Sequence, residues 1–94
     1  MLKTISIIVS GKVQGVWYRK FIQQKAIELG ITGTVQNQTD GTVLITATGS
    51  EANLEKLAEW CGKGPDKAIV EEVNITMETL HEFDEFKIIR HLFG

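Results

Sequence analysis

Residues 11–20 read GKVQGVWYRK, and the hydrophobic period of the chain changes across them. Before this stretch, residues 3–10 alternate between apolar and polar side chains, which is typical of a half-buried strand. After it, from Val16 to Leu29, apolar residues recur at helical spacing, and Gly30 is a residue type at which helices commonly end. The stretch therefore predicts a strand and a helix joined by a glycine-containing loop.

The same periods continue along the rest of the chain. Residues 31–38 and 42–48 flank Asp40-Gly41, a favourable hairpin turn. Ser50 can cap a second helix, which Pro65 prevents from continuing. Residues 70–77 alternate again. A short edge strand around residues 86–88 is also expected.

The resulting order is βαββαβ, with one extra terminal strand. This order predicts the α+β class and the ferredoxin-like sandwich: an antiparallel sheet with two helices on one face. We expect a single domain over residues 1–94, because a chain of 94 residues suits one hydrophobic core. No dimer seam is evident, so a monomer is expected.

The composition excludes several classes of function. The formal net charge of -2 gives no general attraction to nucleic acid or to an anionic membrane, so an anion site would have to be local. The apolar start lacks the cleavage-type end of a signal peptide, and no segment reaches the length of a membrane span. A cytoplasmic protein without a membrane partner is expected.

The junction carries cations where a helix usually carries acids. Lys12, Arg19 and Lys20 crowd it, and the next acidic residue is Glu28. A helix N-terminus has a partial positive charge and unpaired N–H groups, which favour anions. A glycine-containing loop can form a hollow of backbone N–H groups, and the guanidinium of Arg19 can bind two oxygens of the same anion. The alternative is an ordinary turn with solvated cations.

The sequence lacks the groups that other phosphate chemistries need. It has neither a Walker loop nor a dinucleotide fingerprint, and no carboxylate cluster for a metal. Cys61 lies on the apolar stripe of the second helix and is interpreted as a packing residue, and His81 and His91 as surface residues. Such a site could hydrolyse only a phosphate with an easy leaving group, such as the carboxylate of a mixed carboxylic–phosphoric anhydride.

Asn37, near the end of the second predicted strand, is a candidate for the side chain that orients the attacking water. An amide can donate one hydrogen bond and accept another. The alternative is that Asn37 only helps the chain to enter the hairpin, where Asn is common.

Along nearly its whole length the sequence resembles the acylphosphatase family. The matching motifs are GKVQGVWYR at residues 11–19, AxxLGIxG at 26–33, VxNxxDG at 35–41, and GP followed by AxV within 64–70. The resemblance implies the ferredoxin-like fold and hydrolysis of acyl phosphates to carboxylate and inorganic phosphate, with no metal or other cofactor. It implies Arg19 and Asn37 as the catalytic residues. The implied phosphate-binding residues are Val13, Gln14, Gly15, Val16, Trp17, Tyr18 and Arg19.

Two positions depart from the family pattern. Many members carry an aromatic residue where this chain has Thr34 and a basic residue where it has Gln36. We expect activity to persist, since neither position is catalytic in the family. Two alternatives remain open. One is a non-catalytic phosphate-binding regulatory module on the same fold. The other is a domain that binds RNA across its open sheet face, which would need exposed aromatics that the central strands almost lack.

Overall fold

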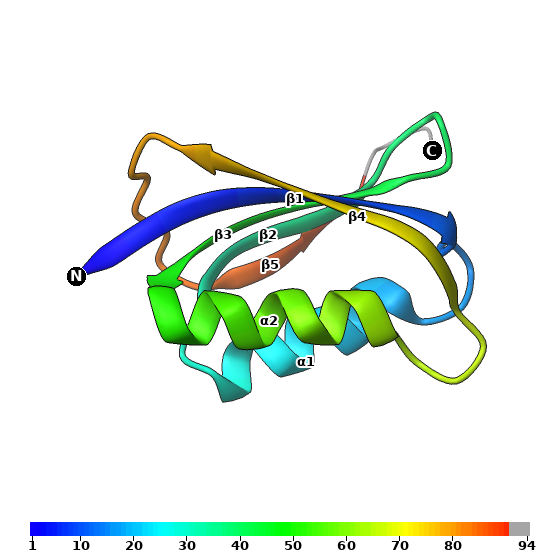
Figure 1. The fold of residues 1–94 in the computed structure, drawn as a ribbon, viewed down its shortest axis with the longest axis horizontal. Coiled ribbons are helices and arrows are strands. Elements are labelled where there is room, and N and C mark those ends of the chain that lie inside the picture. Colours follow the sequence, from blue (N-terminus) through cyan, green and yellow to red (C-terminus); the bar gives the residue numbers. More distant parts are fainter. Residues whose placement is uncertain (91–94) are drawn as a thin grey trace.

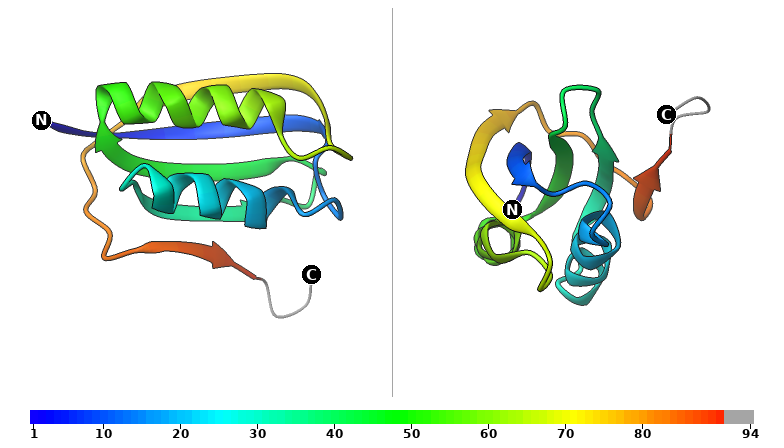
Figure 2. Two further views of the ribbon diagram at one scale, coloured as in Figure 1. Left: turned by 90° about the horizontal axis from the view of Figure 1, so that it is seen from below. Right: turned by 90° about the vertical axis from the view of Figure 1, so that its right-hand side faces the viewer.

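The computed structural model describes residues 1–90. The strands and helices in this part of the chain are β1 (Leu2–Lys12), α1 (Tyr18–Glu28), β2 (Thr32–Asn37), β3 (Val43–Ser50), α2 (Glu51–Lys63), β4 (Ile69–Glu78) and β5 (Phe86–Ile89). The strands form one sheet in the order β4-β1-β3-β2-β5, and both helices cover the same face of it (Figure 1, Figure 2). The predicted ferredoxin-like α+β fold is confirmed, with the extra strand at one edge.

The extra strand makes the sheet mixed. The four strands β1 to β4 pair antiparallel, as predicted, whereas β5 pairs parallel with β2. The cause is the route of the chain. Residues 79–85 cross from the β4 edge to the opposite edge, so β5 starts at the end of the sheet where β4 finishes. Because β4 is antiparallel to β2, β5 is then parallel to β2.

Polar contacts hold the crossing segment against the sheet. Thr4 and Thr48 are only 1% and 3% exposed, and their hydroxyl groups share a hydrogen bond of 2.6 Å. The Thr48 hydroxyl also donates to the backbone carbonyl of His81 at 2.6 Å, and the backbone N–H of His81 donates to the Thr4 hydroxyl. The His81 side chain is exposed, as interpreted from the sequence. His91 lies outside the described residues.

Both helices begin for local reasons. α1 begins at Tyr18 rather than Val16, because Trp17 before it has a left-handed backbone with a φ of 65°. α2 is capped as predicted: the Ser50 hydroxyl accepts a hydrogen bond of 3.2 Å from the backbone N–H of Asn53. Neither helix in residues 1–90 is long and apolar enough to cross a membrane.

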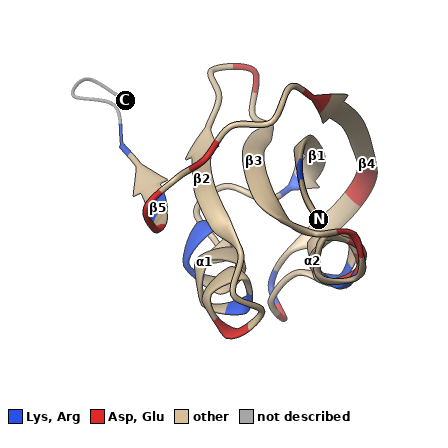
Figure 3. Cartoon of the chain, turned by 90° about the vertical axis from the view of Figure 1, so that its left-hand side faces the viewer, with Lys and Arg blue, Asp and Glu red and all other residues tan. Residues whose placement is uncertain are grey.

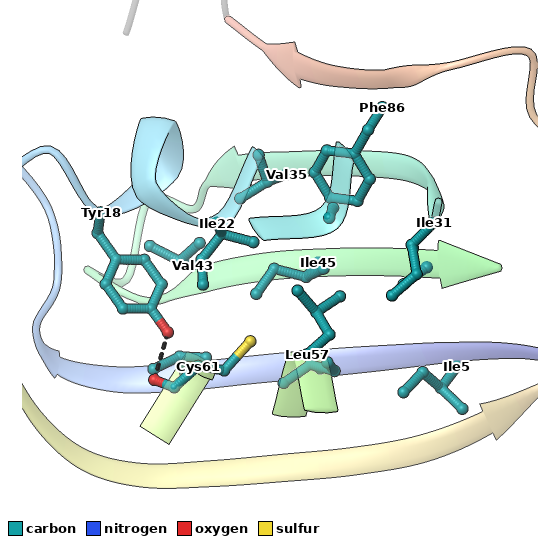
Figure 4. Packing of buried hydrophobic residues seen from close by; sticks show 14 of the residues in the cluster. Ile5, Tyr18, Ile22, Ile31, Val35, Val43, Ile45, Leu57, Cys61 and Phe86 are labelled. Atoms are coloured by element: carbon teal, nitrogen blue, oxygen red, sulfur yellow. Dashed lines mark hydrogen bonds between the residues drawn. The ribbon is translucent and has the colours of Figure 1, made fainter. Parts of the chain in front are cut away.

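The core lies between the sheet and the helices, where the alternating residues of β1 meet the apolar stripes of α1 and α2 (Figure 4). The Tyr18 hydroxyl donates a hydrogen bond of 2.6 Å to the backbone carbonyl of Cys61, which joins the start of α1 to the end of α2. Burial raises the pKa of the Cys61 thiol to about 12. Cys61 is therefore a neutral packing residue, as interpreted, because a reactive cysteine needs a thiolate.

Candidate active site

The candidate site lies at the end of the sheet where β1, β2 and β5 finish and α1 begins (Figure 2). A hollow of about 480 Å³ opens there. It is lined by Val13, Gly15, Trp17, Tyr18, Arg19, Lys20, Asn37, Ile88 and Arg90. The hollow therefore joins the β1–α1 loop to the end of β2, as the two sequence motifs require.

The β1–α1 loop has the backbone of an anion-binding hollow. Gly15 and Trp17 both have a positive φ, of 73° and 65°, with Val16 between them. Changes of backbone handedness at neighbouring residues turn successive N–H groups toward one side. The hydrogen bonds found within residues 1–90 include none donated by the backbone N–H groups of residues 14–20. These groups are free to bind an anion.

Trp17 is the non-glycine residue with a positive φ in the described chain, and its neighbours hold it there. Val16 is 8% exposed and Tyr18 is 1% exposed, whereas Trp17 is 79% exposed. A left-handed backbone costs a non-glycine residue about 1–2 kcal/mol. Burial of the two flanking side chains offsets this cost and leaves the indole in solvent. Sequence reasoning did not detect this turn, because tryptophan gives no signal for a positive φ.

The charges around the hollow are of one sign. Among the described residues its lining contains Arg19, Lys20 and Arg90 and no carboxylate. The first turn of α1 has no acidic residue, and no side chain caps its N–H groups. Figure 3 shows basic residues along α1 and directly after β5. A helix N-terminus among cations favours an anion, which supports the anion-site interpretation over a solvated turn.

Asn37 brings an unpartnered acceptor to the hollow. It is the last residue of β2, and it shares the helix-facing side of that strand with Val35, two residues earlier, which is fully buried. The side-chain oxygen Oδ1 of Asn37 is buried and has no hydrogen-bond partner within residues 1–90. Leaving such an acceptor unpaired costs about 1–3 kcal/mol. A donor that enters the hollow, such as a water molecule, would remove that cost.

Gln14 links the loop to the hairpin that follows Asn37. Its side-chain nitrogen Nε2 donates two hydrogen bonds of 2.9 Å, to the backbone carbonyls of Gln38 and Thr42. The carboxylate of Asp40 in turn accepts hydrogen bonds from the hydroxyl and the backbone N–H of Thr42. These bonds hold the pKa of Asp40 below its usual value. The loop and the end of β2 are thus tied together next to the hollow.

The sequence-predicted site residues divide into two groups. Five of the predicted loop residues and Asn37 line the hollow: Val13, Gly15, Trp17, Tyr18 and Arg19. Gln14 and Val16 do not line it. The side chain of Gln14 binds the hairpin and that of Val16 is buried, so only their backbone N–H groups are available to an anion. Val13 and Tyr18 are also buried.

Sequence reasoning missed Lys20, Ile88 and Arg90 as lining residues. Ile88 and Arg90 could have been located from the direction in which β5 pairs with β2. The local sequence pattern of β5 does not indicate whether this pairing is parallel or antiparallel. The two departures from the family pattern, Thr34 and Gln36, alternate with Val35 and therefore face the side of the sheet away from the hollow.

Comparisons with known proteins identify the family of the chain. The family model described as acylphosphatase matches residues 5–88. The acylphosphatase of Marinobacter nauticus is 49% identical over 82 residues, which cover 86% of this chain and 89% of that protein.

Solved structures lead to the same family. The structure of an acylphosphatase from Coxiella burnetii has a TM-score of 0.90 and 36% identity, covering 94% of this chain and 93% of that one. The acylphosphatase from Bacillus subtilis has a TM-score of 0.91 and 35% identity, covering 96% and 100%. The chain therefore belongs to the acylphosphatase family, the hydrolases that cleave acyl phosphates to carboxylate and phosphate.

Proposed function

We propose that this acylphosphatase works through the hollow between α1 and β2, with Arg19 and the loop N–H groups binding the phosphoryl group and Asn37 positioning water. One observation carries the proposal. Unpaired backbone donors, a guanidinium and a buried acceptor without a partner converge on one hollow that has no carboxylate among its described lining.

In the bound state, the phosphoryl oxygens accept hydrogen bonds from backbone N–H groups of the loop and from the guanidinium of Arg19. The start of α1 adds its partial positive charge. A guanidinium can bind two oxygens at once, which fixes the direction of the phosphorus–oxygen bond that breaks. Gln14, Val16 and Tyr18 act through their backbone N–H groups, since their side chains are buried or bound elsewhere. The backbone N–H of Val13 already donates to the carbonyl of Gly11, so Val13 contributes to the wall of the hollow rather than a donor.

Hydrolysis needs a water molecule opposite the leaving carboxylate. Oδ1 of Asn37 accepts a hydrogen bond from this water. This hydrogen bond orients the water so that a lone pair of the water oxygen points toward phosphorus. The new phosphorus–oxygen bond forms as the bond to the acyl oxygen breaks. The bonding electrons leave with the carboxylate, and both protons of the water leave with the phosphate product, as dihydrogen phosphate. Phosphoryl transfer asks a protein mainly for positioning and charge stabilisation, and a carboxylate departs with little need of a proton. The Tyr18 hydroxyl is not available as an acid, because it donates to Cys61 inside the core.

Two variants test these roles. Arg19→Ala should lose both the binding of inorganic phosphate and turnover. Asn37→Ala should keep phosphate binding and lose turnover by about 10²–10³, the usual effect of removing one preorganised contact. Calorimetry measures binding, and a timed assay of benzoyl phosphate hydrolysis with a chelator present measures turnover. Asn74→Ala, an exposed asparagine on β4, is the matched control.

The proposal fails if both site variants hydrolyse the substrate at near the wild-type rate. A wild-type protein that binds phosphate but leaves acyl phosphate to its spontaneous decay would instead be a binding module. A chelator that stops the reaction would show that a metal takes part.

The proposal extends to the chain as a whole: one domain over residues 1–94, acting as a cytoplasmic monomer. The match of the family model to residues 5–88 supports one domain. A mass near 10.5 kDa by light scattering after gel filtration supports a monomer, and a doubled mass contradicts it.

A further inference from the structure

β5 brings to the hollow a cation that the mechanism above does not use. The register of the parallel pair runs from Gly33 beside Phe86 to Gln36 beside Ile89. One step further along both strands sets Arg90 beside Asn37. Had β5 paired antiparallel with β2, the end of β5 would lie at the opposite end of the sheet.

The alternation of the strand directs Arg90 to the helix-facing side. Phe86, which is 3% exposed, and Ile88 lie on the side of the sheet that α1 covers. Residues two apart in a strand share a face, so Arg90 follows Ile88 on this side. Both residues line the hollow. Lys87, between Phe86 and Ile88, faces the other way.

Lys20 approaches the same wall from the helix. The side-chain nitrogen of Gln23 donates a hydrogen bond of 3.1 Å to the backbone carbonyl of Phe86, so Gln23 and Phe86 lie at the same position along the strand direction. α1 runs against β5. Lys20, about one turn before Gln23, is therefore displaced toward Ile88 and Arg90. The hollow thus has Arg19 and the loop N–H groups on one side, and Lys20 and Arg90 on the side of β5.

The hollow is larger and more positive than a phosphoryl group requires. Its volume of about 480 Å³ lies within the range of sites that hold a whole small molecule, roughly 300–1,000 Å³. Arg19 and the loop N–H groups suffice to bind the phosphoryl oxygens. Two cations then remain beside the space for the acyl group, with no carboxylate in the described lining to pair with them.

We propose that Arg90 and Lys20 bind a second anionic group carried by the acyl part, so that the enzyme prefers acyl phosphates whose acyl group ends in an anion. This inference rests on the proposed function, since it takes the phosphoryl group to lie against Arg19. It assigns Arg90 a role in substrate choice rather than in bond breaking.

Matched substrates test the preference. Benzoyl phosphates with a carboxylate at the meta or para position are compared with the same compounds carrying an uncharged carboxamide, at a fixed 0.1 M ionic strength. In the wild type, kcat/KM should be roughly tenfold higher for the better of the two carboxylates, a gain typical of one hydrogen bond to a charged group near solvent. The difference should lie mainly in KM.

Variants assign the preference to a residue. Arg90→Gln should remove most of it, because only Lys20 then remains, while changing kcat/KM for the carboxamides less than threefold. Arg90→Lys should restore part of the lost preference. Lys87→Gln removes the same charge from the other side of β5 and should leave the preference intact. The affinity for inorganic phosphate, measured by calorimetry, should stay within about twofold in Arg90→Gln.

Three results overturn the inference: a wild type indifferent to the carboxylate, an equal loss on both substrate classes in Arg90→Gln, or an equal loss of preference in Lys87→Gln. In each case hydrolysis of benzoyl phosphate itself, and its loss in Arg19→Ala, would still support the proposed function.

Discussion

Replacing Gln14 with leucine removes both hydrogen bonds that tie the β1–α1 loop to the β2–β3 hairpin. Each bond is 2.9 Å long and joins a side-chain nitrogen to a backbone carbonyl, of Gln38 or Thr42. Leucine keeps a similar volume but cannot donate. At about 0.5–1.5 kcal/mol for each bond, the free energy of unfolding should fall by about 1–3 kcal/mol. In a domain of this size, this lowers the Tm by at least about 4 °C.

The effect on catalysis should exceed the effect on binding. The backbone N–H groups of the loop remain in Gln14→Leu, so inorganic phosphate should bind within about threefold of the wild type. Asn37 lies next to Gln38, however, and its place relative to the loop depends on the lost bonds. A displacement of about 1 Å in a catalytic group can cost about 10²-fold in rate. We expect kcat for benzoyl phosphate to fall by roughly ten- to hundredfold.

A control within the same hairpin separates positioning from general damage. The side chain of Gln38 donates to the Thr42 hydroxyl at 2.9 Å and, within residues 1–90, makes no hydrogen bond to the loop. Gln38→Ala should therefore lower stability by a similar amount per bond and leave kcat within about threefold. The reasoning is refuted if Gln14→Leu retains the wild-type kcat, or if Gln38→Ala loses as much.

Two further predictions concern stability. Burial raises the pKa of the Cys61 thiol from 9.0 to about 12, so as the pH rises the unfolded chain loses this proton before the folded chain does. The free energy of unfolding is therefore unaffected by Cys61 below about pH 9. Above that pH it falls by up to about 1.4 kcal/mol per pH unit. Urea unfolding at pH 7 and pH 10.5 measures the fall, which Cys61→Ala should reduce; equal stability at both pH values would contradict it. Trp17→Gly should be about 1 kcal/mol more stable than Trp17→Ala by thermal unfolding, because only glycine accepts the positive φ freely. The opposite ranking would show that the turn is not strained.

Local patterns in the sequence were sufficient for most of the fold. The periods of residues 3–10 and 16–29 place a strand and a helix around the loop, and Ser50 caps α2 where its residue type and position predicted. The absence of acids before Glu28 is likewise visible in the sequence, and it pointed to an anion at the start of α1. These features depend only on residues that are neighbours along the chain.

Tertiary structure decided how the candidate site is completed. Gln14 finds its two carbonyl partners 24 and 28 residues away, and Arg90 reaches the hollow only because residues 79–85 return the chain in the direction of β2. Likewise, the left-handed turn at Trp17 lies between two side chains that are buried only in the folded chain. The hydrophobic period indicates which face of a helix or strand is buried. It does not indicate which element packs against that face, in which direction a strand pairs, or which side chains meet at the end of a sheet. Those depend on the whole chain closing around one core.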